Sequence, residues 1–384
     1  MIPFNKPYIT GKELDYIADA VGTGKISGNG KYTRLAQQFF EEKFGIRKAL
    51  LTTSCTDALE MCALLLNISP GDEVIIPSYT FVSTANAFML RGAKVVFADS
   101  RADHPGMDED SIEELITPKT KAIVIVHYAG VACDMTKIMD LAAKYNLAVV
   151  EDAAHAIDSY FLTPAGERKP LGSIGHLATF SFHETKNISS GEGGLLAIND
   201  EKYVHRAEII WEKGTNRASF FRGEINKYGW VDLGSSFLPS EVTAAFLWAQ
   251  LENMSQIQQR RIEIWERYDQ NLRGHVENFG IRLPEIPDFA TNNGHMYYLI
   301  AEDGDQRDFL LKEMKSEGSL AVFHYLSLHS SEYFASKHDG RELKNSDLYS
   351  ERLVRLPFFY ELTLDEVDRI SSKLTEILER YAFA

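Results

Sequence analysis

The chain has 384 residues, 45% of them hydrophobic and 25% charged, which is the balance of a soluble globular protein long enough for two domains. Its formal net charge of -15 argues against nucleic acid or an anionic membrane as the main partner. No apolar run approaches the roughly 20 residues of a membrane-spanning helix, and the N-terminus lacks the pattern of a signal peptide. The three cysteines show no metal-ligand spacing, so we expect free thiols, no metal site and a cytoplasmic protein.

The first expected elements are two amphipathic helices separated by a glycine-rich loop over residues 22–30. In the first, residues 11–21, the helical period places Leu14, Ile17, Ala18 and Val21 on one apolar face. The second contains Leu35, Phe39 and Phe44 near helical spacing. The loop could approach a ligand, although a plain connector explains its glycines equally well.

From residue 48 to 200, apolar strands alternate with helical patterns. The expected strands are 49–51, 74–76, 95–97, 122–126, 148–150, 177–182 and 195–198. Among the helical segments between them are 58–66, 112–116 and 136–145. Continuous apolar strands joined by helices predict an α/β fold with a large, doubly wound, mostly parallel sheet. Ligands bind such sheets beyond the carboxyl ends of the strands, so the residues there are the site candidates.

The C-terminal part predicts a smaller α+β domain. A long helical stretch begins near residue 240, where Pro239-Ser240 is a start signal, and runs to about 268. Strands are expected over 295–300 and 320–325 with a helix between them, and a terminal helix follows from 364. We therefore expect a large domain with N-terminal helices over 1–250 and a small one over 251–384.

Two of the strand ends offer parts of a binding site. Thr52 to Ala58, after the first strand, places hydroxyl groups and backbone N–H groups at a helix start, which suits a phosphate. Taken alone, an ordinary Ser/Thr helix cap explains this segment better. Phe81, after the second strand, could stack on a flat heteroaromatic ring, although a core position is the commoner fate of such a residue.

The fifth strand ends in Glu151 and Asp152, and a buried carboxylate needs a partner. A pyridinium nitrogen is such a partner, and an aspartate there keeps the ring protonated as an electron sink. A helix cap explains Asp152 nearly as well. For His155, three residues on, a packed or solvent-facing side chain is the favoured interpretation from the residues alone.

The strand over 177–182 leads to Lys186 and then to a glycine-rich turn over 191–194. A lysine held near a strand end beside small hydroxyl residues could bind a carbonyl cofactor as a Schiff base. Each part of this pattern is weak alone, since a single lysine is more often a surface residue. A phosphate cradle, a stacking ring, an acid and a lysine in chain order at successive strand ends together indicate pyridoxal 5'-phosphate.

At these residues the chain resembles the sugar-nucleotide aminotransferases of the DegT/StrS family, which have the type I aspartate-aminotransferase fold. The resemblance extends from Pro3 to Pro357 and is carried by four segments: 54–56, 77–84, 151–155 and 181–187. Further similarity to a subgroup that acts at C4 of the sugar lies in 127–133, 213–217 and 322–325.

The resemblance implies a role for each site residue. Lys186 would be the catalytic residue and covalent anchor, Asp152 would face the pyridine nitrogen, and Phe81 would stack on the ring. The remaining cofactor-binding positions that we expect are Cys55, Thr56 and Ser181 at the phosphate, His155, and Ser236 from a neighbouring subunit.

Two departures from the family pattern stand out. Ser236 occupies the position of an asparagine and Leu238 that of an arginine, so the contact across subunits is less certain. The segment 161–169 is longer than the usual turn. Its effect on the substrate entrance is left open.

The resemblance further implies a homodimer that moves an amino group from glutamate to C4 of a dTDP-4-keto-6-deoxyhexose, giving dTDP-4-amino-4,6-dideoxygalactose for surface polysaccharides. The gluco epimer, reaction at C3 and a UDP- or GDP-linked sugar stay open. Lys186 argues against a dehydratase of the same family, in which histidine replaces this lysine. A non-catalytic cofactor-binding regulator is a less favoured alternative, because no DNA-binding extension is visible. The lack of GxGxxG after the first strand counts against a nicotinamide-dependent enzyme.

Overall fold

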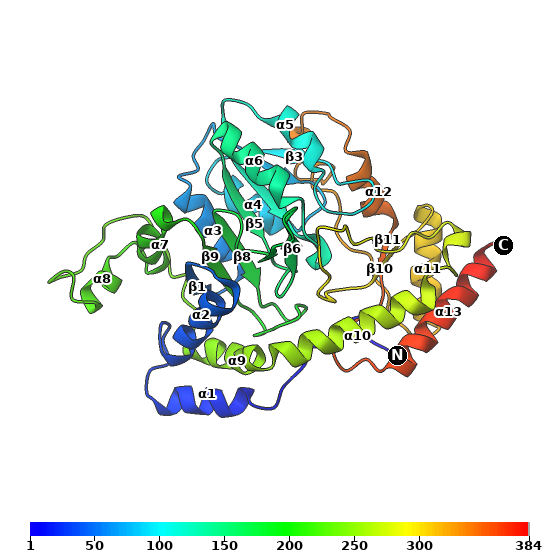
Figure 1. Cartoon of the computed structure of the whole chain (residues 1–384), viewed down its shortest axis with the longest axis horizontal. Coiled ribbons are helices and arrows are strands. Elements are labelled where there is room, and N and C mark those ends of the chain that lie inside the picture. The colour runs from blue at the N-terminus through cyan, green and yellow to red at the C-terminus, as the bar shows by residue number, and fades with distance from the viewer. Residues whose placement is uncertain (383–384) are drawn as a thin grey trace.

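A seven-stranded sheet forms the centre of the computed structural model, which describes residues 1–382 of the chain (Figure 1). Its order is β1-β9-β8-β5-β4-β2-β3. All neighbouring strands are parallel except where β9 pairs antiparallel with β1 and β8. The strands are β1 (Lys48–Thr52), β2 (Glu73–Pro77), β3 (Lys94–Ala98), β4 (Thr120–Val126), β5 (Ala148–Asp152), β8 (Leu177–Ser181) and β9 (Gly194–Ile198). The predicted mostly parallel sheet is confirmed.

Both faces of the sheet are buried, as the apolar strands predicted. Along β4, Ile123 and Ile125 enter one core cluster while Ala122 and Val124 enter the other, because successive side chains of a strand point to opposite faces. The first cluster includes residues of α2 (Lys31–Phe44), α5 (Ile112–Leu115), α6 (Met135–Tyr145) and α9 (Glu241–Glu252). The second includes residues of α3 (Cys55–Leu65), α4 (Val82–Met89) and α7 (Val204–Trp211).

The first helix, α1 (Glu13–Gly22), packs through a different face from the one predicted. Leu14 and Val21 are 77% and 54% exposed, whereas Glu13 and Ala20 are buried. The buried carboxylate of Glu13 is satisfied by the N–H groups of Thr10 and Gly11 and by the side chain of Gln250 in α9. A fully hydrogen-bonded carboxylate is tolerated in the core, so apolar periodicity alone placed the inner face wrongly.

The additional residues over 161–169 belong to a hairpin of β6 (Tyr160–Leu162) and β7 (Arg168–Pro170). The Arg168 guanidinium lies 3.6 Å from the centroid of the Tyr160 ring. Phe161 is buried and bridges Ala290, so the hairpin packs on a segment of the C-terminal part.

The C-terminal part consists of helices around a two-stranded sheet. Its elements are α10 (Met254–Leu272), β10 (Tyr298–Ile300), α11 (Gly304–Ser316), α12 (Lys344–Arg352), β11 (Leu353–Arg355) and α13 (Leu364–Ala382). Figure 1 shows α9 and α10 end to end along one side of the molecule. The single long helix expected there is divided at Asn253, which has φ −101° and ψ 8°.

One expected strand in this part is wrong. Residues 320–325 make a single bridge, Val322 to Arg355, and the partner of β10 is instead β11. A separate core cluster joins Ile2 to residues 264–378. The division into domains at residue 250 stays a prediction.

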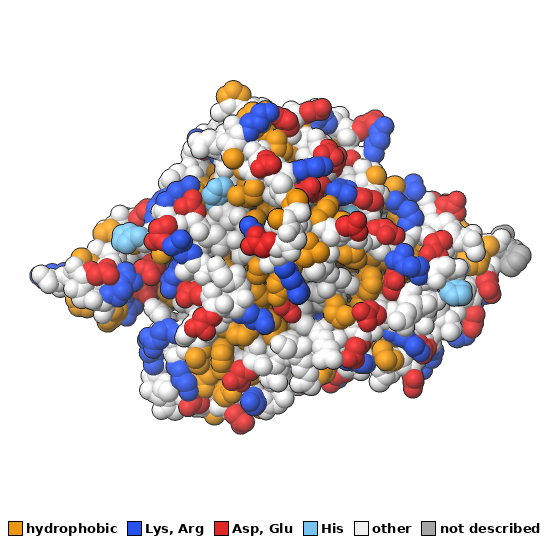
Figure 2. Space-filling model, in the orientation of Figure 1, with side chains coloured by type: hydrophobic (Ala, Val, Ile, Leu, Met, Phe, Trp, Pro, Cys, Tyr) orange, Lys and Arg blue, Asp and Glu red, His pale blue; other side chains and the backbone are white. Residues whose placement is uncertain are grey.

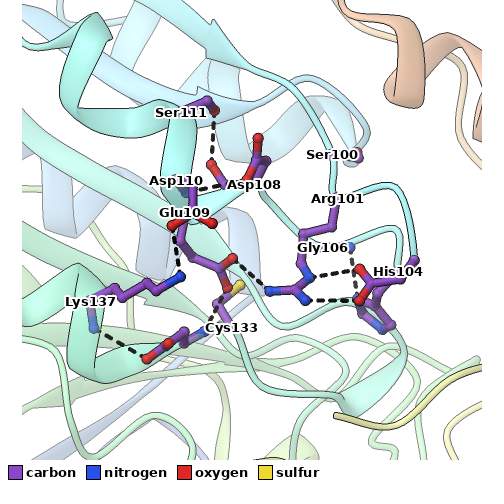
Figure 3. A network of polar contacts seen from close by, with 12 residues as sticks. Ser100, Arg101, His104, Gly106, Asp108, Glu109, Asp110, Ser111, Cys133 and Lys137 are labelled. Atoms are coloured by element: carbon purple, nitrogen blue, oxygen red, sulfur yellow. Dashed lines mark hydrogen bonds and ion pairs between the residues drawn. The ribbon is translucent and has the colours of Figure 1, made fainter.

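A network of polar contacts holds the loop that follows β3 (Figure 3). Arg101 donates to the carboxylates of Asp103 and Glu109, at 2.9 Å and 3.1 Å. The other oxygen of buried Glu109 accepts the N–H of Asp134 at 2.6 Å, and Asp134 caps α6. The network therefore ties the edge of the sheet to the connection between β4 and α6.

Acidic and basic side chains are interspersed over the face drawn in Figure 2. Among residues 1–382 no helix is both long and apolar enough to cross a bilayer.

Candidate active site

A cavity of about 580 Å³ lies at the carboxyl ends of the central strands. Seven of the eight predicted site residues line it: Cys55, Thr56, Phe81, Asp152, His155, Ser181 and Lys186. They come from the ends of β1, β2, β5 and β8 or the turns that follow, as the topology of a parallel sheet predicts. Ser236 is exposed and lies outside the lining of this subunit's cavity.

The turn after β1 ends in the N-terminus of α3. The Ser54 hydroxyl caps the helix by accepting the N–H of Asp57 at 3.1 Å, and the first intrahelical bond runs from Ala58 to the Ser54 carbonyl. Cys55 and Thr56 come before the first residue whose N–H group donates within the helix, so their N–H groups are available to bind an anion. The helix cap predicted from the sequence is therefore present, and it leaves room for the phosphate cradle that was posed as its alternative.

A glycine makes this cradle possible. Gly194, the first residue of β9, approaches the turn so closely that an added Cβ would lie 2.3 Å from the carbonyl carbon of Ser54. The Thr56 hydroxyl also contacts the Ser83 hydroxyl of α4 at 2.8 Å. Hydroxyl groups from two helix starts therefore meet at the same side of the cavity.

Asp152 supplies a buried carboxylate to the cavity wall. One oxygen accepts the Thr84 hydroxyl at 2.8 Å and the other accepts the N–H of Ala154 at 3.2 Å. Burial raises the pKa of this carboxyl group, while Thr84 and Ala154 lower it. A cationic ring nitrogen is the kind of partner that such a carboxylate needs.

Phe81 is the residue before α4, and its ring is not part of the core. It is 55% exposed, lines the cavity and lies 6.1 Å from the centroid of the Tyr325 ring. This position suits stacking on a heteroaromatic ring and disfavours the alternative of a core phenylalanine.

Lys186 lies in the turn between β8 and β9, and its neighbour Asn187 fixes that turn. The buried Asn187 amide donates to the Gln258 side chain at 2.9 Å and to the Asn293 carbonyl at 3.0 Å. Burial lowers the pKa of Lys186 to about 8, with an opposing effect of Cys55 and Asp152 and a further lowering by Arg355. An amine with that pKa is partly neutral near pH 7 and can act as a nucleophile or base.

His155 is packed beside the cavity rather than facing solvent. Its Nδ1 accepts the N–H of Ala129 at 3.3 Å, so Nε2 carries the proton and donates to the Tyr325 hydroxyl at 3.3 Å. Its ring stacks on His295 at a centroid distance of 4.2 Å. Burial lowers the pKa of both histidines, which are therefore neutral near pH 7.

Several cavity residues had no role in the sequence-based prediction. Thr84 orients Asp152, and its place in the same segment as Phe81 was the available signal. Arg355 carried no signal, because β11 was not expected. The other cavity residues without a predicted role include Ser83, His183, Glu192, His295, His324 and Tyr325. His329 is not in the cavity lining and contacts the Ser78 hydroxyl at 2.8 Å instead.

These features fit pyridoxal phosphate on structural grounds. The free N–H groups at α3 suit its phosphate, the buried Asp152 carboxylate suits its ring nitrogen, the exposed face of Phe81 suits its ring, and Lys186 suits its aldehyde. The arrangement places the four groups around one cavity. It can therefore hold the cofactor, while the role of each residue stays a prediction.

Known proteins provide an independent comparison. Residues 7–375 match the model of the DegT/DnrJ/EryC1/StrS aminotransferase family. The aminotransferase TlmJ from Streptoalloteichus hindustanus is similar over 100% of both chains, with 28% identity and a TM-score of 0.89. A putative sugar aminotransferase, Spr1654 from Streptococcus pneumoniae in its PMP form, is 26% identical over 99% of this chain and 100% of its own, at a TM-score of 0.89.

A third structure, S. venezuelae DesV, is 26% identical over 99% of both chains with a TM-score of 0.88. The predicted aminotransferase-like fold is thus confirmed, and pyridoxal phosphate is the cofactor. The chain belongs to the DegT/DnrJ/EryC1/StrS family and is a pyridoxal-phosphate-dependent sugar aminotransferase.

Proposed function

We propose that this enzyme transfers an amino group from glutamate to C4 of a dTDP-linked 4-keto-6-deoxyhexose, giving dTDP-4-amino-4,6-dideoxygalactose for a cell-surface polysaccharide. The observation that carries the amino transfer is the single cavity in which Lys186, Asp152 and Phe81 meet beside the α3 N-terminus. The choice of C4 and of the galacto product is supported by the sequence resemblance over 127–133, 213–217 and 322–325.

In this proposal each residue of the chain has one task. The N–H groups of Cys55 and Thr56 hold the phosphate, and Asp152 keeps the ring nitrogen protonated while Thr84 orients the carboxylate. The bound cofactor supplies an electron sink for charge that develops at the substrate carbon. Lys186 would hold the cofactor and, as a neutral amine, would move a proton to and from the substrate carbon.

The proton transfer requires that Lys186 be neutral when it acts as a base. Desolvation provides this state by lowering its pKa to about 8. The stacked, uncharged imidazoles of His155 and His295 add no positive charge beside the amine near pH 7.

We also propose a homodimer with the active site at its interface. Residues 217–233, which include α8 (Arg217–Phe221), form an arm that projects from the body next to α7 (Figure 1). The arm exposes Phe221 at 68% and Trp230 at 82%, which is unusual for side chains that face only water. Ser236 follows directly after this arm, where a partner subunit could receive its hydroxyl group.

A substrate panel tests the proposal. The enzyme is incubated with glutamate and dTDP-, UDP- and GDP-linked 3-keto and 4-keto deoxy sugars, and nuclear magnetic resonance reads the position and configuration of the new amine. We expect dTDP-4-amino-4,6-dideoxygalactose. Amination at C3, a gluco product or preference for another nucleotide would contradict the proposed substrate.

A further inference from the structure

The aim of the Lys186 side chain depends on the turn that carries it. Lys186 lines the cavity, and among residues 1–382 no side chain hydrogen-bonds its amine. A lysine side chain has many rotamers, so the position of its backbone decides which points the amine can reach. That position is controlled by the next residue, Asn187.

The C-terminal part of the chain holds the buried carboxamide group of Asn187 from three directions. The nitrogen of this group donates to Oε1 of Gln258 at 2.9 Å and to the backbone carbonyl of Asn293 at 3.0 Å. Its oxygen lies 2.8 Å from Nδ1 of His295. Because a carboxamide oxygen only accepts hydrogen bonds, Nδ1 of His295 carries a proton and donates it. The hydrogen bond from His295 is thus the one that fixes the oxygen side of Asn187.

The same residues also contact the turn that follows Asp152. The buried Asn293 side chain donates to the carbonyl of His155 at 2.8 Å and accepts the N–H of His295 at 3.1 Å. The rings of His155 and His295 stack at a centroid distance of 4.2 Å. The aldehyde and the ring nitrogen of pyridoxal phosphate lie at opposite positions of one rigid ring, so Lys186 and Asp152 need a fixed spacing. Asn293 and His295 connect the two turns whose spacing matters.

The segment that contains His295 is itself firmly held. The buried guanidinium of Arg261 in α10 donates to the carbonyls of Gly294 and His295, at 2.9 Å and 2.8 Å. On the other side, a Cβ added to Gly130 would lie 2.1 Å from Oδ1 of Asn293. The packing leaves no space into which this segment could shift, so His295 presents its Nδ1–H group at a fixed point.

We propose that His295 is a positioning residue for Lys186 and acts through the carboxamide of Asn187. This inference rests on the proposed role of Lys186 as the residue that holds the cofactor. A nucleophile that is misplaced by about 1 Å reacts much more slowly, although its ligand still binds. His295 should therefore control how fast Lys186 captures the aldehyde, and should leave the contacts to the phosphate and the ring unchanged.

Two substitutions of the same residue isolate the hydrogen bond. The amide nitrogen of asparagine is as many bonds from the backbone as Nδ1 of histidine, so His295→Asn keeps the donor to Asn187. The amide nitrogen of glutamine corresponds to Nε2 instead, so His295→Gln loses this donor. Both variants lose the ring that stacks on His155, and a difference between them therefore reports the bond to Asn187 rather than the packing.

The measurement uses the cofactor-free protein and two forms of the cofactor. Stopped-flow absorbance gives the rate of covalent capture of pyridoxal phosphate, and titration gives the affinity for pyridoxamine phosphate, which has no aldehyde. We expect His295→Gln to slow capture about 10-fold or more and to keep the wild-type affinity for pyridoxamine phosphate. His295→Asn should retain most of the capture rate. The control is His275→Gln, at an exposed histidine after α10 and outside the cavity lining, which should behave as wild type.

A double-mutant cycle tests the path through Asn187. Asn187→Ala alone should slow capture, and adding His295→Gln should then have little further effect, because both changes remove the same contact. Wild-type capture by His295→Gln, equal slowing in the two His295 variants, or additive losses in the cycle would overturn the proposal. A matching loss of affinity for pyridoxamine phosphate would also overturn it, because the site as a whole would then be damaged.

Failure of the proposed function gives different results. If wild type captures the cofactor on Lys186 but aminates no sugar of the panel, the proposed substrate is wrong while the role of His295 stands. Capture at another lysine would refute the role of Lys186 and, with it, this inference.

Discussion

At the scale of single residues, the proposed reaction depends on how the cavity changes the acidity of Lys186. Desolvation favours the neutral amine, Asp152 and Cys55 favour the charged form, and Arg355 opposes them. The balance lowers the pKa from the 10.5 of a free lysine to about 8. An amine with this pKa is partly neutral near pH 7, as the proposed role of Lys186 requires.

The pH dependence of cofactor binding checks this balance. The neutral amine is the form that attacks an aldehyde, so the rate at which cofactor-free enzyme captures pyridoxal phosphate should rise with pH and level off above about 8. Stopped-flow absorbance over a range of pH values measures this rate, with a lysine derivative in solution as the control. A rate that still rises near the pKa of a free lysine, 10.5, would contradict the lowered pKa.

At the scale of secondary-structure elements, the site depends on how closely β9 approaches the N-terminus of α3. Gly194 has no Cβ, and any side chain there would collide with the backbone of Ser54 and Cys55. The glycine-rich turn that follows Lys186 thus also shapes the opposite side of the cavity, where the phosphate is expected.

Replacement of that glycine should damage both stability and cofactor binding. We expect Gly194→Ala to lower the free energy of unfolding by about 1–3 kcal/mol, because backbone atoms have to move, and to weaken affinity for pyridoxal phosphate. Urea unfolding and cofactor titration measure the two effects. Gly22→Ala is the control, since an added Cβ at the end of α1 meets nothing within 4 Å; equal behaviour of the two variants would refute this role.

The elements also show what sequence patterns can predict. The strands of the central sheet were predictable because continuous apolar runs of three to six residues alternate there with helical patterns. The rule that ligands bind at strand ends then brought Asp152 and Lys186 together. Hydrophobic periodicity failed to predict the buried face of a helix where a polar side chain is buried and fully hydrogen-bonded, as Glu13 is. It also failed for β11, in which only Leu353 and Val354 are apolar, and with β11 the position of Arg355 was missed.

At the scale of the whole molecule, one subunit leaves an apolar arm exposed and Ser236 outside its own cavity. A second subunit that covered the arm would bury Phe221 and Trp230 and remove this unfavourable exposure to water. Both the exposed arm and the exposed position of Ser236 are consistent with assembly through this face.

Disruption of the arm tests the proposed dimer. The double variant Phe221→Ser/Trp230→Ser should shift the particle mass from two chains to one in light scattering and lower amino transfer. Leu14→Ser, at an exposed apolar residue of α1 away from the arm, is the comparison. A wild-type enzyme that is already monomeric and active would rule out the dimer.

The central claim is that Lys186 holds the cofactor, and peptide mapping tests it most directly. Borohydride treatment of the holoenzyme fixes the carbonyl carbon of pyridoxal phosphate to the amine that binds it, and mass spectrometry then locates the modified residue. The account predicts the added mass on Lys186 in wild type, and for Lys186→Ala no fixed cofactor and no amino transfer. Modification of another lysine, or full activity of Lys186→Ala, would contradict it.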